Sequence, residues 1–114
     1  MALKEPFYIV ANLTPVPGKS QEVIAAIQPL TEYVQANEPG CLHYEMFQPA
    51  GPDVDAASAP VVFIELWKDM EALEIHRNSE PYKALMVRAS TEGLLAAPPD
   101  VKVLQPVGGF PLRK

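Results

Sequence analysis

The sequence is poor in the residues that many binding and catalytic sites require. It contains one cysteine, Cys41, and only two histidines. A single cysteine cannot form an internal disulfide, which predicts a reducing compartment and therefore a cytoplasmic protein. One cysteine and two histidines at these spacings do not make a metal site. No glycine-rich phosphate loop is present, because Gly108-Gly109 stands alone near the C-terminus, so we expect no nucleotide and no other cofactor.

Positive charge and long apolar runs are also scarce. Lys and Arg number 9 against 14 Asp and Glu, which gives a formal net charge of −5 without a basic cluster. Such a surface cannot neutralise phosphates, so we expect neither a nucleic-acid partner nor binding to an anionic membrane. The apolar run Phe7–Val10 is too short for the core of a signal sequence or for a membrane span.

What the sequence does contain is the balance of a globular protein. Hydrophobic residues make up 48% of the 114 residues and charged residues 20%, which is enough for one hydrophobic core and too little for two. We therefore expect a single domain over residues 1–114. Its core should run from about residue 6 to residue 107, followed by a C-terminal arm over residues 108–114.

Hydrophobic periodicity and breaker residues predict the order strand, helix, strand, strand, helix, strand. Ser20 is suited to cap the first helix, which Glu38-Pro39-Gly40 should stop. The second helical region is predicted to be broken in two, because Asp69 and Ser79 are both suited to cap a helix. We expect strands over 7–14, 41–48, 61–68 and 101–107, and helices over 20–37, 70–78 and 81–97.

This order fits an α+β, ferredoxin-like split β-α-β fold, in which a four-stranded antiparallel sheet carries its helices on one face. The first strand alternates between two apolar sets, with Asn12 on the side of Tyr8 and Val10. The third strand is apolar on both sides as well. Because the helices can cover only one face, we expect a homodimer whose sheets pack together.

The side chains with chemical potential gather in the segment Val61–Ala84. Trp67 ends a strand, and the short helix after Asp69 carries His76 on its inward side, three residues after Leu73. Asn12 interrupts an apolar strand, so it should find partners or line a cavity. We predict catalytic roles for His76, Trp67 and Asn12, and substrate-binding roles for Phe63, Tyr44, Tyr82 and Met86. Two further polar residues are expected at exposed or dimer-facing positions, namely His43 and Glu65.

Four segments, in order, resemble the antibiotic biosynthesis monooxygenase-like family of dimeric α+β barrels. They are VPGK at Val16–Lys19, EPGCLHYE at Glu38–Glu45, IELWKDMEALEIH at Ile64–His76 and PYKAL at Pro81–Leu85. The resemblance implies a pocket between sheet and helices that holds small, often aromatic, molecules. The best-studied members oxidise quinols or polyketide anthrones without metal or flavin. Others degrade haem or isomerise small metabolites.

Subfamily residues can be compared one at a time. Haem-degrading relatives combine a first-strand Asn with a helix Trp and a later His, whereas this chain has Asn12 with His76 and Met86. It therefore lacks the axial ligand, and haem degradation is not expected. Relatives that oxidise polyketides share the strand-end Trp, which Trp67 matches. Some of them add an Asn and a Tyr where this chain has Phe63 and Leu73.

These observations lead to three functional hypotheses. The first is a cofactor-independent monooxygenase of secondary metabolism that acts, with molecular oxygen, on a small phenolic, quinol or anthrone-like compound. His76 would remove the proton, Trp67 and Phe63 would hold the anion, and Asn12 would bind its oxygen. The second is an isomerase, dehydratase or cyclase for an enolisable metabolite in the same pocket. The third is a dimer that binds a small molecule without converting it.

Overall fold

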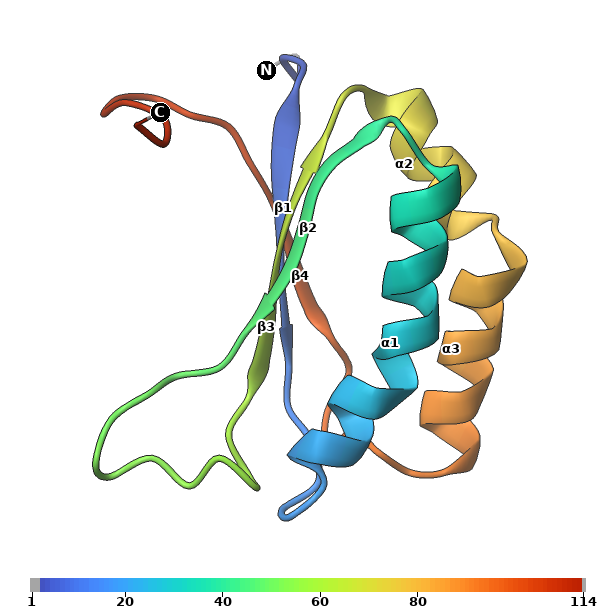
Figure 1. The fold of residues 1–114 in the computed structure, drawn as a ribbon, viewed down its shortest axis with the longest axis vertical. Helices are drawn as coiled ribbons and strands as arrows, with labels where there is room; N and C mark the ends of the chain where they lie inside the picture. Colours follow the sequence, from blue (N-terminus) through green and yellow to red (C-terminus); the bar gives the residue numbers. More distant parts are fainter. Residues whose placement is uncertain (1–2, 114) are drawn as a thin grey trace.

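The computed structural model describes residues 3–113, so residues 1, 2 and 114 of the predicted domain lie outside the described range. A single antiparallel sheet forms one layer, and all the helices lie against one of its faces (Figure 1). The strands are β1 (Phe7–Leu13), β2 (Cys41–Phe47), β3 (Val61–Trp67) and β4 (Asp100–Leu104). The helices are α1 (Ser20–Asn37), α2 (Met70–Arg77) and α3 (Glu80–Thr91).

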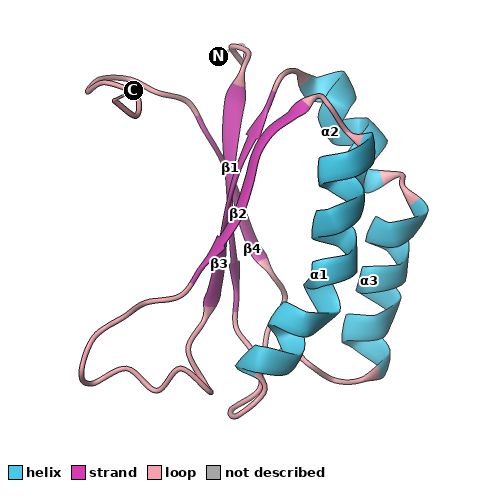
Figure 2. Ribbon diagram, in the orientation of Figure 1, coloured by secondary structure: helices cyan, strands magenta, loops and turns pink. Residues whose placement is uncertain are grey.

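The strand order β2-β3-β1-β4 confirms the predicted ferredoxin-like fold. β1 lies between β3 and β4, while β2 pairs only with β3, and all three pairings are antiparallel. Figure 2 shows the three helices stacked on one side of the strands and the long β2–β3 loop extending away from them. The sheet therefore has a helix side and an open side.

The alternation of side chains along each strand determines which residues enter the core on the helix side and which lie on the open side. On the helix side, Phe7, Ile9 and Ala11 of β1 are buried, as are Phe63 and Trp67 of β3. The helix α1 completes this core with one apolar stripe, which consists of Val23, Ala26, Ile27, Leu30 and Val34. On the open side, Tyr8 and Val10 of β1 are only half buried. The core thus lies entirely between the sheet and the helices.

Helix ends agree with the predicted caps in two of three cases. Asp69 Oδ1 accepts from the backbone N–H of Ala72 at 2.8 Å, and Ser79 Oγ accepts from that of Tyr82 at 3.3 Å, so both caps are confirmed. The predicted cap at Ser20 is wrong. Lys19 holds the cap position, and the buried Ser20 hydroxyl instead donates to the carbonyl of Ala59 at 2.6 Å. Ser20 therefore ties the start of α1 to the segment that enters β3.

The second half of the chain departs most from prediction at the end of α3. The helix stops at Thr91 instead of continuing to residue 97. Gly93 takes a left-handed φ of +60°, which favours glycine and ends the helix. Leu95 then bridges back to Pro15, so the chain follows the sheet edge into β4. The C-terminal arm leaves β4 on the open side, away from the helices (Figure 1).

Candidate functional site

A small chamber lies between the helix side of the sheet and the three helices. Its volume is about 110 Å³. The walls are mostly aliphatic and aromatic, with two buried ionisable side chains among them, Glu65 of β3 and His76 of α2. The other lining residues are Ile9, Ala11, Leu13, Ile27, Leu30, Tyr44, Phe63, Leu73, Arg77, Tyr82, Leu85, Met86, Pro99 and Val101.

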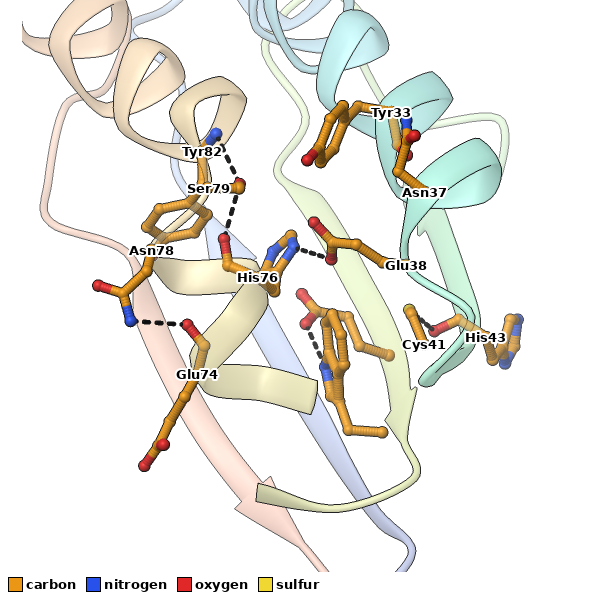
Figure 3. Close-up of polar contacts among 12 residues, drawn as sticks. Tyr33, Asn37, Glu38, Cys41, His43, Glu74, His76, Asn78, Ser79 and Tyr82 are labelled. Carbon is orange, nitrogen blue, oxygen red and sulfur yellow. Dashed lines mark hydrogen bonds and ion pairs between the residues drawn. The ribbon is translucent and has the colours of Figure 1, made fainter. Parts of the chain in front are cut away.

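His76 is held from two directions. The α2 cap at Asp69 sets where the helix begins, and Ser79 Oγ donates to the His76 carbonyl at 2.8 Å where the helix ends. The side chain is buried, and its Nδ1 lies 2.9 Å from Glu38 Oε1 (Figure 3). Within residues 3–113 the structure gives no hydrogen-bond partner to Nε2, so this nitrogen is the one left for a ligand in the chamber.

Glu38 reaches His76 from the end of α1, as Figure 3 shows. Its backbone N–H still bonds to the Val34 carbonyl, while Pro39 and Gly40 turn the chain into β2. The carboxyl group is buried, and its Oε2 has no partner within the described residues. A buried carboxylate with an unpartnered oxygen is costly, and burial raises the pKa of Glu38.

Burial shifts both members of this pair toward their uncharged forms. It lowers the pKa of His76 to about 4, with a smaller contribution from the positive charge of Arg77. Removing the pair from water favours neutral Glu38 beside neutral His76 over two opposite charges. The direction of the hydrogen bond between Glu38 Oε1 and His76 Nδ1 depends on the tautomer of His76, and Nε2 is an acceptor when Nδ1 carries the hydrogen and a donor when it does not.

Glu65 is the chamber residue whose position the sequence did not predict. It is 8% exposed and lines the chamber, whereas an exposed or dimer-facing position was expected. Burial raises the pKa of Glu65 to about 7, while a hydrogen bond from Trp67 and the charge of Arg77 oppose that rise. The Trp67 Nε1–H donates to Glu65 Oε1 at 2.9 Å. The signal was available, because Glu65 alternates in phase with Phe63 and Trp67.

Aromatic rings surround the imidazole of His76. Its ring centre lies 4.8 Å from that of Trp67, 5.1 Å from that of Tyr82 and 5.5 Å from that of Tyr44. Tyr44 also packs on Phe63 at 4.8 Å. Burial raises the pKa of the Tyr44 hydroxyl, so this group stays protonated at neutral pH. The site is therefore an aromatic enclosure around two proton-exchanging groups.

The structure brings together most of the residues predicted to form the site. His76 lines the chamber, and so do four predicted substrate-binding residues, namely Phe63, Tyr44, Tyr82 and Met86. Trp67 is fully buried but is not among the lining residues. Its N–H is bonded to Glu65, so the predicted contact between Trp67 and a bound anion does not fit this geometry.

Asn12 lies on the wrong side of the sheet for the predicted role. It pairs with Val62 of β3 and Asp100 of β4 and follows the alternation of Tyr8 and Val10 on the open face. Ala11 and Leu13, its neighbours in sequence, line the chamber instead. The sheet therefore separates the Asn12 side chain from His76. His43, by contrast, is exposed as expected and contacts Glu45 at 2.8 Å.

The described residues provide neither a metal-binding cluster nor a membrane-spanning helix. Among residues 3–113, no group of three or more His, Cys, Asp or Glu side chains could hold a metal ion. None of the helices in this range has both the length and the apolar character needed to cross a membrane.

Comparison with known proteins gives a family model and many similar structures. The family model described as antibiotic biosynthesis monooxygenase matches residues 6–88. A structure from Caulobacter crescentus with the same family description has 28% identity, covers 90% of each chain and has a TM-score of 0.72. A Pseudomonas aeruginosa protein has 26% identity, covers 95% of this chain and 100% of its own, and has a TM-score of 0.73. A search of curated proteins gives no match.

Proposed function

The chain belongs to the antibiotic biosynthesis monooxygenase family, and from this premise we propose that it oxidises a small phenolic, quinol or anthrone-like compound with molecular oxygen and without a cofactor. One observation carries the proposal: Glu65 and His76 line the same apolar chamber from opposite elements, the sheet and α2. Acid–base groups in a dry aromatic enclosure suit a reaction that begins with loss of a proton.

Glu65 is the proposed general base. A base works best when its pKa lies near the working pH, and burial raises the pKa of Glu65 to about 7. His76, with a pKa lowered to about 4, is a weaker base than the sequence-based hypothesis assumed. In the tautomer that carries its hydrogen on Nε2, His76 is instead suited to donate to the substrate oxygen, on which negative charge develops.

The reaction balances without a further reductant. Once Glu65 holds the proton, the electron-rich anion transfers an electron to oxygen, and the two radicals combine at carbon. For an anthrone-like methylene group, the resulting hydroperoxide loses water and leaves a ketone. One oxygen atom of O₂ enters the product. The other leaves as water, together with the two hydrogens of the methylene group.

The test uses chelator-treated protein with anthrone under ¹⁸O₂, with a no-protein reaction to subtract spontaneous oxidation. We expect oxygen consumption and one labelled oxygen atom in the product. Glu65→Gln should lower the rate by about 10²–10⁴-fold, the usual contribution of a general base. The matched control is Glu45→Gln, which changes an exposed carboxylate that contacts only His43. Oxidation no faster than in the no-protein reaction would refute the proposal.

The same geometry also favours a second candidate, isomerisation of an enolisable metabolite. Glu65 and His76 approach the chamber from two sides, so one could remove a proton while the other guides its return to a different carbon. Incubation without oxygen in D₂O distinguishes the two reactions. Deuterium incorporation with turnover would favour the isomerase, while a bound compound recovered unlabelled and unchanged would indicate a binding protein.

A homodimer completes the proposal. The open face of the sheet carries Tyr8, Val10 and Ile64, which are half buried in one chain, and a second copy is the simplest cover for such a face. Light scattering should give twice the mass of one chain. Ile64→Lys places a charge on this face and should shift the protein toward the monomer. A monomeric wild-type protein would contradict this part of the proposal.

A further inference from the structure

A second cavity lies beside the chamber, between α1 and α3, and is partly open to solvent. Its volume is about 480 Å³. Of the residues that line this groove, Ser90 alone has a polar side chain, and none is charged. The lining residues are Leu13, Val23, Ala26, Ile27, Leu85, Met86, Ala89, Ser90, Gly93, Leu94, Leu95, Ala96, Ala97, Pro98 and Pro99.

The groove and the chamber adjoin one another. They share five lining residues, which come from β1, α1, α3 and the segment before β4, namely Leu13, Ile27, Leu85, Met86 and Pro99. Among them Met86 is 41% exposed, and an unbranched Met side chain adapts readily to irregular spaces. A change of the Met86 rotamer would therefore let a molecule whose one end lies beside His76 extend its other end into the groove.

The size of the chamber limits what fits beside Glu65 and His76. A protein cavity of about 150 Å³ holds benzene, whereas the chamber measures about 110 Å³. It therefore accommodates no more than a single ring. The groove, at about 480 Å³, falls within the range of about 300–1,000 Å³ that is typical of small-molecule sites. Any substrate larger than one ring must occupy both.

We propose that the substrate is a hydroxylated ring with an uncharged apolar extension, an alkyl chain or further fused rings, and that the groove between α1 and α3 binds this extension. The inference rests on the proposed function for the identity of the reacting ring. The groove offers neither a cation nor a carboxylate to an extension that carries charge. A phosphate or carboxylate tail would lose its hydration without compensation there, which excludes substrates with such tails.

The test measures binding without turnover. The probes are phenol and 4-alkylphenols with two, five and eight carbons, titrated calorimetrically under nitrogen. Each methylene that enters the groove should raise affinity up to about fourfold, which corresponds to about 0.8 kcal/mol. A 4-carboxyalkylphenol of matched length should lose this gain. An affinity that does not change with chain length would overturn the inference.

Two tryptophan substitutions in α3 test whether the groove is where the alkyl chain binds. Ala89→Trp fills the groove, because Ala89 lines it, and should reduce the affinity for octylphenol toward that for phenol while leaving phenol binding intact. Ala84→Trp is the control, since Ala84 is exposed on the same helix and does not line the groove. Equal losses in both variants would overturn the inference. It would also fail if Ala89→Trp changed only the oligomeric mass, because a second copy would then fill the groove.

The binding experiment and the oxygen-consumption experiment can fail independently of each other. If chain length and Ala89→Trp act as expected but no oxygen is consumed, the groove is a binding site and the proposed oxidation is wrong. If oxygen is consumed while affinity ignores chain length, the oxidation stands and the groove has no part in substrate binding.

Discussion

Trp67 follows Glu65 by two residues on β3, and its indole N–H donates to the Glu65 carboxylate at 2.9 Å. Both side chains therefore point to the helix side of the sheet, where one lines the chamber and the other packs behind it. The hydrogen bond lowers the pKa of Glu65 against the larger, raising effect of burial. Trp67 thus acts on the chamber through Glu65 instead of touching a ligand directly.

Trp67→Phe should raise the pKa of Glu65 above its present value of about 7. Phenylalanine keeps most of the ring volume but cannot donate to the carboxylate, so the ionised form loses a stabilising bond. The pH profile of the oxidation should keep its shape while its acid limb moves to higher pH. The same substitution made in the Glu65→Gln protein provides the control, where no such movement is expected. An unmoved limb in Trp67→Phe would show that the indole does not tune Glu65.

Glu65 should also make the free energy of unfolding depend on pH. Its pKa is about 7 when folded, against an ordinary value of 4.5, so the folded state holds more protons than the unfolded state between these two pH values. The contribution of Glu65 is therefore fully present below pH 4.5 and is lost as the pH rises through 7. Glu65→Gln removes this loss. Relative to wild type, the variant should gain roughly 3 kcal/mol between pH 4 and pH 8.

Urea denaturation at the two pH values measures that gain. Glu45→Gln serves as the control, because Glu45 is exposed and its substitution should shift stability little and equally at both pH values. A Glu65→Gln difference that is the same at pH 4 and pH 8 would mean that Glu65 titrates normally. The role of Glu65 as a base near neutrality would then lose its support.

The fold and half of the site follow from local patterns in the sequence. Period-two alternation put Asn12 opposite Ile9 on the first strand and Phe63 in phase with Trp67 on the third. The caps at Asp69 and Ser79 fixed the helix that carries His76. Asn12 was assigned to the pocket from its polarity, against its own alternation. Glu65 was assigned to the surface for the same reason, because a charged residue is rarely buried without a partner.

The rest of the site depends on contacts between distant parts of the chain. Glu38 and His76 are 38 residues apart, and a Glu-Pro-Gly sequence indicates only where a helix stops. That the side chain of Glu38 turns inward follows from how α1 and α2 pack on the sheet. The end of α3 likewise depended on Gly93, whose left-handed backbone overrides a helical pattern that continues to residue 97.

The contributions of Glu38 and His76 to the free energy of unfolding should be strongly coupled. Glu38→Leu and His76→Phe each leave one buried polar group without its partner, which should cost about 1–3 kcal/mol per variant. The double variant removes both groups, so its loss should be smaller than the sum of the two, with a coupling of about 0.5–3 kcal/mol. Urea denaturation of the four proteins measures this value.

The same cycle on His43 and Glu45 is a matched control. These residues also lie 2.8 Å apart, but both are about half exposed to solvent. Exposed pairs contribute only about 0.2–1 kcal/mol. If the two cycles gave the same coupling, burial would not be what makes the Glu38–His76 pair special, and the proposed neutral form would lose its physical basis.

Gly40, which precedes β2, lies directly against Ala72 of α2, the helix that carries His76. A Cβ added at Gly40 would lie 2.6 Å from the Cβ of Ala72, far inside contact distance. Gly40→Ala should therefore push α2 away from the sheet and destabilise the protein by about 1–3 kcal/mol. Because α2 carries His76, binding of phenol should weaken as well.

Removing the opposing methyl group tests the cause. Gly40→Ala combined with Ala72→Gly restores the space at this contact, although glycine inside α2 costs about 0.8–1.0 kcal/mol in helix propensity. The double variant should therefore be more stable than the sum of the two single losses predicts, and should regain phenol affinity. If the stability losses of the two single variants simply added in the double variant, Gly40→Ala would act through the backbone of the turn. The spacing between β2 and α2 would then not determine the position of His76.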